Sequence, residues 1–506
     1  METKSRLDRL FNPQTIAFIG ASGNPAKWGF IVPLNILKGQ FRGTLYPVNP
    51  GCESLLGIPC LPSVSAISVP VDLAVITTPA RTVPDLVDEC GRKGVANVVV
   101  ISSDFSETGP EGAALERDVV ARARKYGMRI VGPNTMGLYS SSPRLNALMP
   151  PVAPLDGPLS MVSQSGNVGV QMLYWGNRKG LGFEKFVSSG NEADLTCEDY
   201  LDYFGGDKAT RVVLAYMEGI DGDSGLLDVA RRVSRRKPVL IFKGGRTSTG
   251  NRAASSHSGA MAVSSRVLRA AFRQAGVIGI EDSQGLIDAA KAFSAYPVPR
   301  GNRVGILTRG GGWGVITADA CEERGLEVPP LPDRIVRRLN RILPSYWSHG
   351  NPVDMAANML LEPFMECIEA LAEWDGVDSV IAMGGSIQGI FDFDAHVEGT
   401  KELKETITLA REVAKEYTSQ HDVVLDHTRE MVEKTGKPVI VVTLGDYDGF
   451  LDDLKNHRVV SYPTPERAVT ALKHMVDYRR FLDSPIEPLE YDAKERKHRW
   501  KSLKTH

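Results

Sequence analysis

The sequence predicts an α/β protein built on parallel sheets with helices on both faces. Short β-branched runs alternate with helix-like apolar periods along almost the whole chain, which is the pattern of such sheets. At 506 residues the chain is too long for one hydrophobic core, and the usual domain size predicts about three domains. Two proline-rich stretches, Pro150–Pro158 and Tyr296–Gly301, are the expected boundaries.

The expected strands form three sets. The first set, in a domain of residues 1–150, is Thr15–Ile19, Gly43–Val48, Leu73–Thr77, Val98–Ser102 and Arg129–Val131. The second set, in residues 158–297, is Leu159–Val162, Phe186–Ser188, Val212–Tyr216 and Val239–Lys243. The third set, in residues 301–480, is Arg303–Thr308, Ser379–Met383 and Pro438–Thr443. We expect residues 389–434 to form a helical excursion from the third domain and residues 481–506 to form a polar tail.

Composition excludes several classes of protein. The formal net charge is −2, so the chain lacks the basic excess typical of proteins that bind nucleic acid or anionic membranes. The N-terminus has no apolar signal-peptide core, and no stretch approaches the ~20 apolar residues of a membrane span. The six cysteines are scattered without Cys/His metal spacing, which favours reduced thiols and no metal site. We therefore expect a soluble, cytoplasmic protein.

The first strand runs into a glycine turn, Ile19-Gly20-Ala21-Ser22-Gly23. Such a turn frees backbone N–H groups for a pyrophosphate at a helix start, although it is not the G-x-G-x-x-G fingerprint. The second strand ends at Asn49–Pro50, without the acidic residue that would hold the ribose of NAD. The pattern therefore disfavours NAD and suits a phosphorylated adenine nucleotide such as coenzyme A. Lys27 is a candidate phosphate contact, and a merely solvated lysine is the alternative.

Two further glycine-rich turns follow the first strands of the second and third domains. One contains Ser163, Gln164, Ser165, Gly166 and Asn167, and the other contains Gly310, Gly311, Gly312 and Gly314. Hydroxyls, glycine N–H groups and a helix N-terminus together suit a phosphoryl group. An ordinary helix cap explains the first turn equally well, but consecutive glycines weaken a helix start and are harder to explain by capping. Aimed at one point, the two helix starts would form a strong phosphoryl site.

Between Met1 and Ser348 the chain has one histidine, His257, in the small-residue run Asn251–Met261. Imidazole is the side chain whose protonation is most easily tuned near neutral pH, and small neighbours leave it accessible. Glu218 follows an apolar strand, and a carboxylate bonded to an imidazole fixes its tautomer and stabilises its charged form. A loop histidine without a role and a solvated glutamate are the competing interpretations.

These segments together resemble the α subunit of ADP-forming (NDP-forming) acyl-CoA synthetases and, more distantly, succinyl-CoA synthetase. The resemblance extends to about residue 480 and rests on ordered motifs: FIGAS, YPVNP, ISSDFSETGPEG, RIVGPNTMGLYS, SQSGNVG, SSGNEADLTCEDYLDYF, YMEGI, AASSHSGAMA, ILTRGGGWGV and GNPVDM. It implies an N-terminal Rossmann-like CoA-binding domain followed by two flavodoxin-like domains.

The resemblance also implies roles for individual residues. His257 is expected to be the phosphorylated histidine and Glu218 its support, with the two glycine-rich helix starts holding the phosphate. Coenzyme A is expected to bind near residues of the first domain: Ile19, Gly20, Ala21, Ser22, Lys27, Asn49, Pro50, Ser102, Ser103, Glu107, Pro133 and Asn134.

The implied activity interconverts acyl-CoA, phosphate and ADP with a carboxylic acid, CoA and ATP, through an acyl phosphate and a phosphohistidine. No stretch of ~200 residues remains for the ATP-grasp nucleotide domain that the family requires. We therefore expect Mg-ADP/ATP on a separate β subunit, in an α2β2 assembly. Two alternatives are a non-catalytic acyl-CoA sensor or scaffold, which the intact His257 and Glu218 disfavour, and an NAD-dependent dehydrogenase, which Asn49 disfavours.

Overall fold

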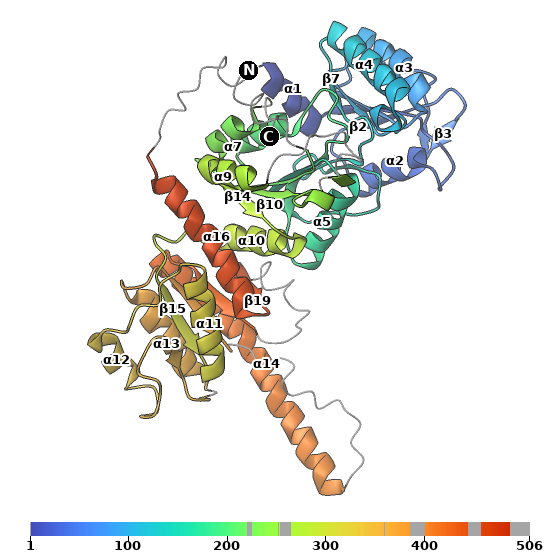
Figure 1. The fold of residues 1–506 in the computed structure, drawn as a ribbon. Coiled ribbons are helices and arrows are strands. Elements are labelled where there is room, and N and C mark those ends of the chain that lie inside the picture. The colour runs from blue at the N-terminus through green and yellow to red at the C-terminus, as the bar shows by residue number, and fades with distance from the viewer. Residues whose placement is uncertain are drawn as a thin grey trace. The chain divides into compact units, whose positions relative to one another are not determined.

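Three mainly parallel sheets organise the part of the chain that the structure describes (Figure 1). The structure is a computed structural model and describes residues 2–219, 225–250, 252–253, 265–358, 360–384, 400–443 and 457–485. Its described residues form two units. Unit 1 comprises the chain up to Asn177, Gly182–Ser283 and Pro485, and unit 2 comprises Arg178–Leu181 and Gln284–Ser484.

The first sheet is parallel throughout, with the order β2-β1-β5-β6-β7. Its strands are β1 (Thr15–Ile19), β2 (Thr44–Val48), β5 (Leu73–Ile76), β6 (Asn97–Val100) and β7 (Arg129–Val131). The helices of this region are α1 (Glu2–Phe11), α2 (Trp28–Lys38), α3 (Val83–Lys93) and α4 (Pro110–Lys125), and a small hairpin pairs β3 (Ser54–Leu55) with β4 (Ile58–Pro59). β5 and β6 are buried at every position, because helices cover both faces of a parallel sheet.

The second sheet has the order β14-β13-β12-β10-β11-β8-β9. Its parallel strands are β10 (Asp156–Ser163), β11 (Phe183–Ser188), β12 (Val212–Met217), β13 (Val239–Lys243) and β14 (Val277–Ile280). Its helices are α5 (Gly166–Arg178), α6 (Cys197–Gly206), α7 (Leu226–Ser234) and α9 (Ser265–Ala275). The antiparallel pair β8 (Gly137–Ser140) and β9 (Leu145–Leu148) extends the β11 edge.

That pair differs from expectation. Residues 137–148 were assigned to the first domain, which was expected to end at residue 150, but β8 pairs with β11 of the second sheet. Leu138 and Ala147 are buried there in a hydrophobic core shared by the first and second sheets. The proline-rich stretch at Pro150–Pro158 therefore follows a segment that already belongs to the second sheet.

The third sheet, in unit 2, has the order β16-β15-β17-β18-β19. Its strands are β15 (Val304–Thr308), β16 (Val353–Asp354), β17 (Ser379–Met383), β18 (Val439–Val442) and β19 (Ser461–Tyr462). The helices of unit 2 are α10 (Ser283–Ala295), α11 (Gly311–Glu323), α12 (Asp333–Leu339), α13 (Leu361–Glu373), α14 (Lys401–Thr435) and α16 (Pro465–Asp483). The three sheets confirm the predicted α/β class of parallel sheets.

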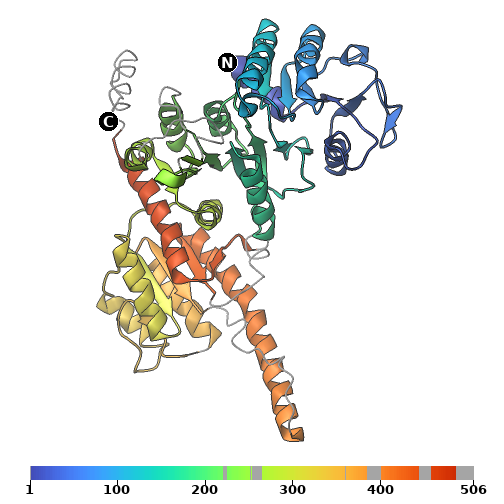
Figure 2. The same ribbon diagram turned by 45° about the vertical axis from the view of Figure 1, so that its right-hand side comes forward.

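Two helices of unit 2 add detail to the expected organisation. α10 was placed in the 158–297 domain, and in the structure its Asp288 forms a bidentate ion pair with Arg467 of α16 at 2.7 Å for both bonds. The 35-residue α14 accounts for most of the expected 389–434 excursion, while residues 385–399 lie outside the described part. Thr400 caps its start and Gly436 ends it in the left-handed conformation, with φ 66°. Its N-terminal half runs past the edge of the third sheet (Figure 2).

Among the helices that the structure describes, none has both the length and the apolarity needed to cross a bilayer.

An aromatic cluster fastens α1 to α6 in unit 1. The Phe11 ring stacks on Tyr203 with centroids 5.2 Å apart and meets Phe204 at 5.6 Å. Phe11 is fully buried, so its truncation removes both apolar burial and ring contacts.

We therefore predict that Phe11→Ala destabilises unit 1 by about 3–5 kcal/mol, as is typical of a buried Phe truncated to Ala. Urea unfolding of the variant measures the effect. Val267→Ala on α9 is the control, because Val267 is exposed and its truncation costs little. Equal stabilities of the two variants would show that the cluster does not hold α1 in place.

Candidate active site

The strand order places the loops that were predicted to bind ligands at equivalent positions in the three sheets. Numbered along the chain, the parallel strands of each sheet follow the order 2-1-3-4-5. In open α/β sheets, ligands bind beyond the carboxyl ends of the strands where this order reverses, between strands 1 and 3. Gly20, Ser163 and Gly310 follow or end the first strand of their sheets, and Glu218 follows the third strand of the second sheet.

The Gly20 turn is packed tightly against α2. Gly20 has φ 98°, and a Cβ there would lie 2.6 Å from Thr77 Oγ1. A Cβ on Gly29 would overlap the carbonyl oxygen of Gly20, and Ser22 N donates to Gly29 O at 3.1 Å. Only glycines allow this approach of turn and helix, which is the geometry that brings a backbone close to a pyrophosphate.

Asn49 connects the ends of β1 and β2. Its Nδ2 donates to Ala21 O at 2.6 Å, and its Oδ1 accepts from Gly51 N at 2.9 Å. Asn49 therefore holds the Gly20 turn in place where a dinucleotide-binding protein would carry an acid. Pro50 follows it, and Lys27 is exposed immediately before α2.

The other predicted CoA contacts lie beyond β6 and β7, on the same edge of the first sheet. Asn134 N donates to Ser102 O at 2.9 Å, which ties the two strand ends together. Pro133 follows a cis peptide bond, and Ser103 and Glu107 are exposed. The structure thus brings the predicted residues of the first domain to one edge of its sheet.

Asn191, which sequence reasoning did not single out, bonds to this edge from the loop after β11. Its Nδ2 donates to Glu107 Oε2 at 2.6 Å, and its Oδ1 accepts from Asn134 Nδ2 at 3.3 Å. Partial burial alone would raise the pKa of Glu107, but bonds from Asn191 and from backbone N–H groups keep it below its ordinary value. Glu107 is therefore held as a carboxylate against the second sheet.

The Ser163–Asn167 turn starts α5 at Gly166. Ser163 Oγ donates to Ser165 O at 2.6 Å, and Ser165 Oγ accepts from Val168 N at 3.4 Å. A Cβ on Gly166 would overlap the Met136 side chain, which fixes a glycine at this helix start. Asn167 is exposed at the first turn of α5.

Gln164 has partners within the protein rather than open donors. Its Oε1 accepts from Glu218 N at 2.6 Å and Gly219 N at 3.1 Å. Its Nε2 donates to Glu192 Oε2 at 3.2 Å and to Gly219 O at 3.4 Å. The amide therefore joins the loops after β10 and β12 instead of presenting a donor to phosphate.

Glu218 is held from two further sides. Tyr216 OH donates to Glu218 Oε1 at 3.2 Å, and Lys243 Nζ donates to Glu218 O at 2.6 Å. Burial and the neighbouring Glu218 charge raise the pKa of Tyr216 to about 12, so the phenol keeps its proton. Burial lowers the pKa of Lys243, and Glu218 opposes that shift.

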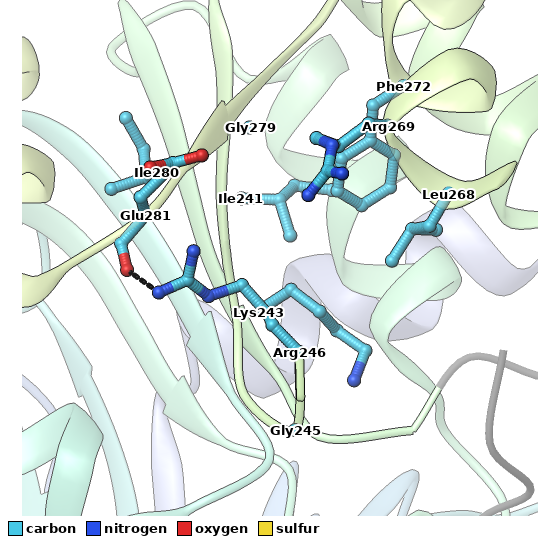
Figure 3. A pocket seen from close by; sticks show the side chains of 10 residues that line it. All are labelled: Ile241, Lys243, Gly245, Arg246, Leu268, Arg269, Phe272, Gly279, Ile280 and Glu281. Carbon is cyan, nitrogen blue, oxygen red and sulfur yellow. Dashed lines mark hydrogen bonds between the residues drawn. The ribbon is translucent and has the colours of Figure 1, made fainter. Parts of the chain in front are cut away.

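His257 lies outside the described residues. The described chain on either side of it comprises β13, the turn through Gly250 and the start of α9. Figure 3 shows a pocket lined by residues of β13, α9 and β14, where Arg246 bonds to the backbone oxygen of Glu281 and Arg269 is a further lining residue. Lys243 also lines it, so cations surround an apolar floor at this end of the sheet.

In unit 2, Gly310 caps α11 and exchanges hydrogen bonds with the Thr308 hydroxyl at 2.8 and 3.1 Å. A Cβ on Gly311 would lie 2.8 Å from Asp354, and one on Gly314 would lie 3.1 Å from Pro352. A Cβ on Gly310 or Gly312 would meet open space. Packing therefore explains two of these glycines, and the other two leave the helix start open.

Comparisons with known proteins agree with this arrangement. A profile described as a CoA binding domain matches residues 14–141, and one described as a succinyl-CoA ligase like flavodoxin domain matches residues 156–293. The α subunit of ADP-forming acetate–CoA ligase I from Pyrococcus furiosus is 36% identical over 94% of this chain and 98% of its own length. This chain belongs to the family of ADP-forming acetate–CoA ligases.

Another member of this family is longer. ADP-forming acetate–CoA ligase I from Archaeoglobus fulgidus is 42% identical over 74% of this chain, and the match spans 54% of its own length. The structure of an acetyl-coenzyme A synthetase from Ca. Korarchaeum cryptofilum, in complex with phosphate and ADP, has a TM-score of 0.82 and 34% identity. It covers 94% of this chain and 98% of that one. The CoA-binding domain and flavodoxin-like fold predicted by resemblance are confirmed.

The packing of the Gly20 turn generates a matched pair of variants. We predict that Gly29→Ala weakens CoA binding about tenfold, because the methyl group displaces the turn that is predicted to approach the pyrophosphate. Gly350→Ala, in unit 2, should bind CoA as the wild type does, since the nearest atom to a Cβ there is Ser348 O at 3.8 Å. Isothermal titration with CoA measures both variants, and equal affinities would exclude the Gly20 turn from the binding site.

Proposed function

We propose that this chain is the catalytic α subunit of an ADP-forming carboxylate–CoA ligase. It converts acyl-CoA and phosphate into an acyl phosphate and CoA, and it then carries the phosphoryl group on His257. The observation that best supports this is the dipeptide Asn191–Glu192. Asn191 bonds to Glu107 and Asn134 at the edge predicted to bind CoA, and Glu192 bonds to Gln164 of the turn predicted to bind phosphate. One rigid link thus joins the two proposed sites within unit 1.

The proposed reaction has three steps. A phosphate oxygen attacks the thioester carbonyl, the C–S bond breaks, and CoA leaves as the acyl phosphate forms. A neutral imidazole nitrogen of His257 then attacks phosphorus, and the carboxylate leaves with the electrons of the P–O bond. The phosphoryl group finally passes to ADP, which gives ATP and restores the imidazole. Each step also runs in reverse.

The proposed roles follow from charge and placement. Phosphoryl transfer depends mainly on positioning and on stabilising the charge of the transferred group. The N-terminus of α5, with Ser163, Ser165, Gly166 and Asn167, supplies N–H and hydroxyl groups for that charge. Glu218 orients the imidazole and stabilises its cationic form. In unit 2, the open helix start at Gly310 and Gly312 is a second proposed phosphate contact, supported by its own free space.

We further propose that an ATP-grasp β subunit binds Mg-ADP or Mg-ATP, in an α2β2 assembly. The match to a protein named an α subunit over 98% of its length supports a separate partner. Acetate is the acid that the family suggests first.

The leading prediction concerns His257. Incubation with acetyl-CoA and labelled phosphate should give acid-labile, base-stable label on the wild-type chain and none on His257→Ala. His498→Ala is the control and should be labelled normally. Absence of label from the wild type across a panel of acyl-CoAs would favour a non-catalytic acyl-CoA sensor.

The partner prediction is separate. ATP formation from acetyl-CoA, phosphate and Mg-ADP should appear only when an ATP-grasp subunit of ~200–250 residues is added. A coupled assay for ATP measures this. Full ligase turnover by the chain alone would contradict the assignment of the nucleotide site to a partner.

A further inference from the structure

Glu192 lies in the loop between β11 and α6, in a conformation that few residues with side chains adopt. Its φ is 56°, in the left-handed region that favours glycine. Backbone bonds fix the loop on both sides: Asn191 N donates to Pro133 O at 3.0 Å, and Ala193 N donates to Gly132 O at 3.2 Å. A strained residue held in this way by its surroundings is common at functional sites.

The Glu192 carboxylate accepts three hydrogen bonds from side chains. Ser189 Oγ donates to its Oε1 at 2.6 Å, and Cys197 Sγ donates to the same oxygen at 2.9 Å. Gln164 Nε2 donates to Oε2 at 3.2 Å. Burial of the carboxyl raises the pKa of Glu192, and these three bonds oppose that shift.

The orientation of the Gln164 amide is fixed by the atoms around it. Glu218 N and Gly219 N are both donors, so they require the amide oxygen. The nitrogen then needs acceptors, and it has two: Glu192 Oε2 at 3.2 Å and Gly219 O at 3.4 Å. Without Glu192, the amide loses the shorter of these two bonds and is held less firmly with its oxygen toward the backbone of Glu218.

We infer that Glu192 is a positioning residue that acts through Gln164 to fix the backbone at Glu218. The inference rests on the proposed function, because Glu218 supports the phosphorylated histidine there. In this proposal Glu192 has no contact with the reacting atoms. It fixes the backbone from which the Glu218 side chain extends toward them.

The donors and acceptors in the hydrogen bonds from Glu192 through Gln164 to the backbone of Glu218 can be exchanged by substitution, which gives a strict test. Glu192→Gln is isosteric, but its amide nitrogen must face either the donor Nε2 of Gln164 or the donors Ser189 Oγ and Cys197 Sγ, so one side of the pattern is lost in either orientation. Gln164→Glu keeps an acceptor for Glu218 N, but it sets two carboxylates against each other. In the double variant the carboxylate at 164 accepts from the backbone and from the amide at 192, so each donor meets an acceptor and the net charge is unchanged.

We predict that each single variant slows labelling of His257 by about tenfold to a hundredfold, the scale of a small misplacement of a catalytic group. The double variant should recover to within about threefold of the wild-type rate, because the bonding pattern is complementary again. Glu111→Gln, at an exposed carboxyl in the first turn of α4, is the control and should label normally. All variants should keep the wild-type affinity for CoA, which reports intact folding of unit 1.

A second readout does not depend on activity. Amide hydrogen exchange of the peptide that contains Glu218 and Gly219 should be faster in Glu192→Gln and return to the wild-type rate in the double variant. Wild-type labelling and exchange in Glu192→Gln, or a double variant no better than the worse single variant, would overturn the inference. If the wild type itself takes no label, the proposed function fails, and hydrogen exchange still decides whether Glu192 fixes Glu218.

Discussion

The pairing of Gln164 with the backbone at Glu218 is the interaction on which the proposed chemistry depends. It joins the loops that follow the first and third strands of the second sheet, at the point where the strand order reverses. Strand order alone brings two loops close, but it does not fix which atoms face the ligand. The side-chain amide of Gln164 forms hydrogen bonds through both its oxygen and its nitrogen, and it therefore holds these two loops together as one rigid edge.

This edge is continuous with the first sheet through a single dipeptide. Asn191 bonds to residues beyond β6 and β7, while the next residue bonds to Gln164. The first and second sheets also share one hydrophobic core, in which residues of α1, β1 and β10 are buried together. A shared core and a hydrogen-bonded link explain how a chain of several domains could hold the proposed thioester site and the proposed phosphoryl site at fixed positions within unit 1. The same strand order in the third sheet provides a third helix start, with open space around Gly310 and Gly312.

Much of this architecture can be predicted from the sequence, because buried parallel strands are short β-branched runs. Thr15–Ile19 and Arg129–Val131 were predicted at their observed ends, and the glycine turn that follows Ile19 is where the first sheet reverses its order. The pairing of β8 and β9 with the second sheet was not predicted, because local pattern does not show which sheet a hairpin joins, and only its pairing with β11 decides this. The two-residue strands β16 and β19 are too short to carry a period.

At the site, the residues were easier to predict than their partners. Gln164 was predicted as a phosphate-binding residue, and in the structure its side-chain amide bonds to Glu218, Gly219 and Glu192. The role of Glu192 could not be predicted from the sequence, because its left-handed conformation is visible only when the structure of its loop is known.

The most direct test of the account is exchange of labelled CoA into acetyl-CoA by this chain without nucleotide. The account predicts exchange that requires phosphate and persists in His257→Ala, because histidine acts only after the acyl phosphate forms. Exchange that is independent of phosphate, or absent from the wild type, would contradict it.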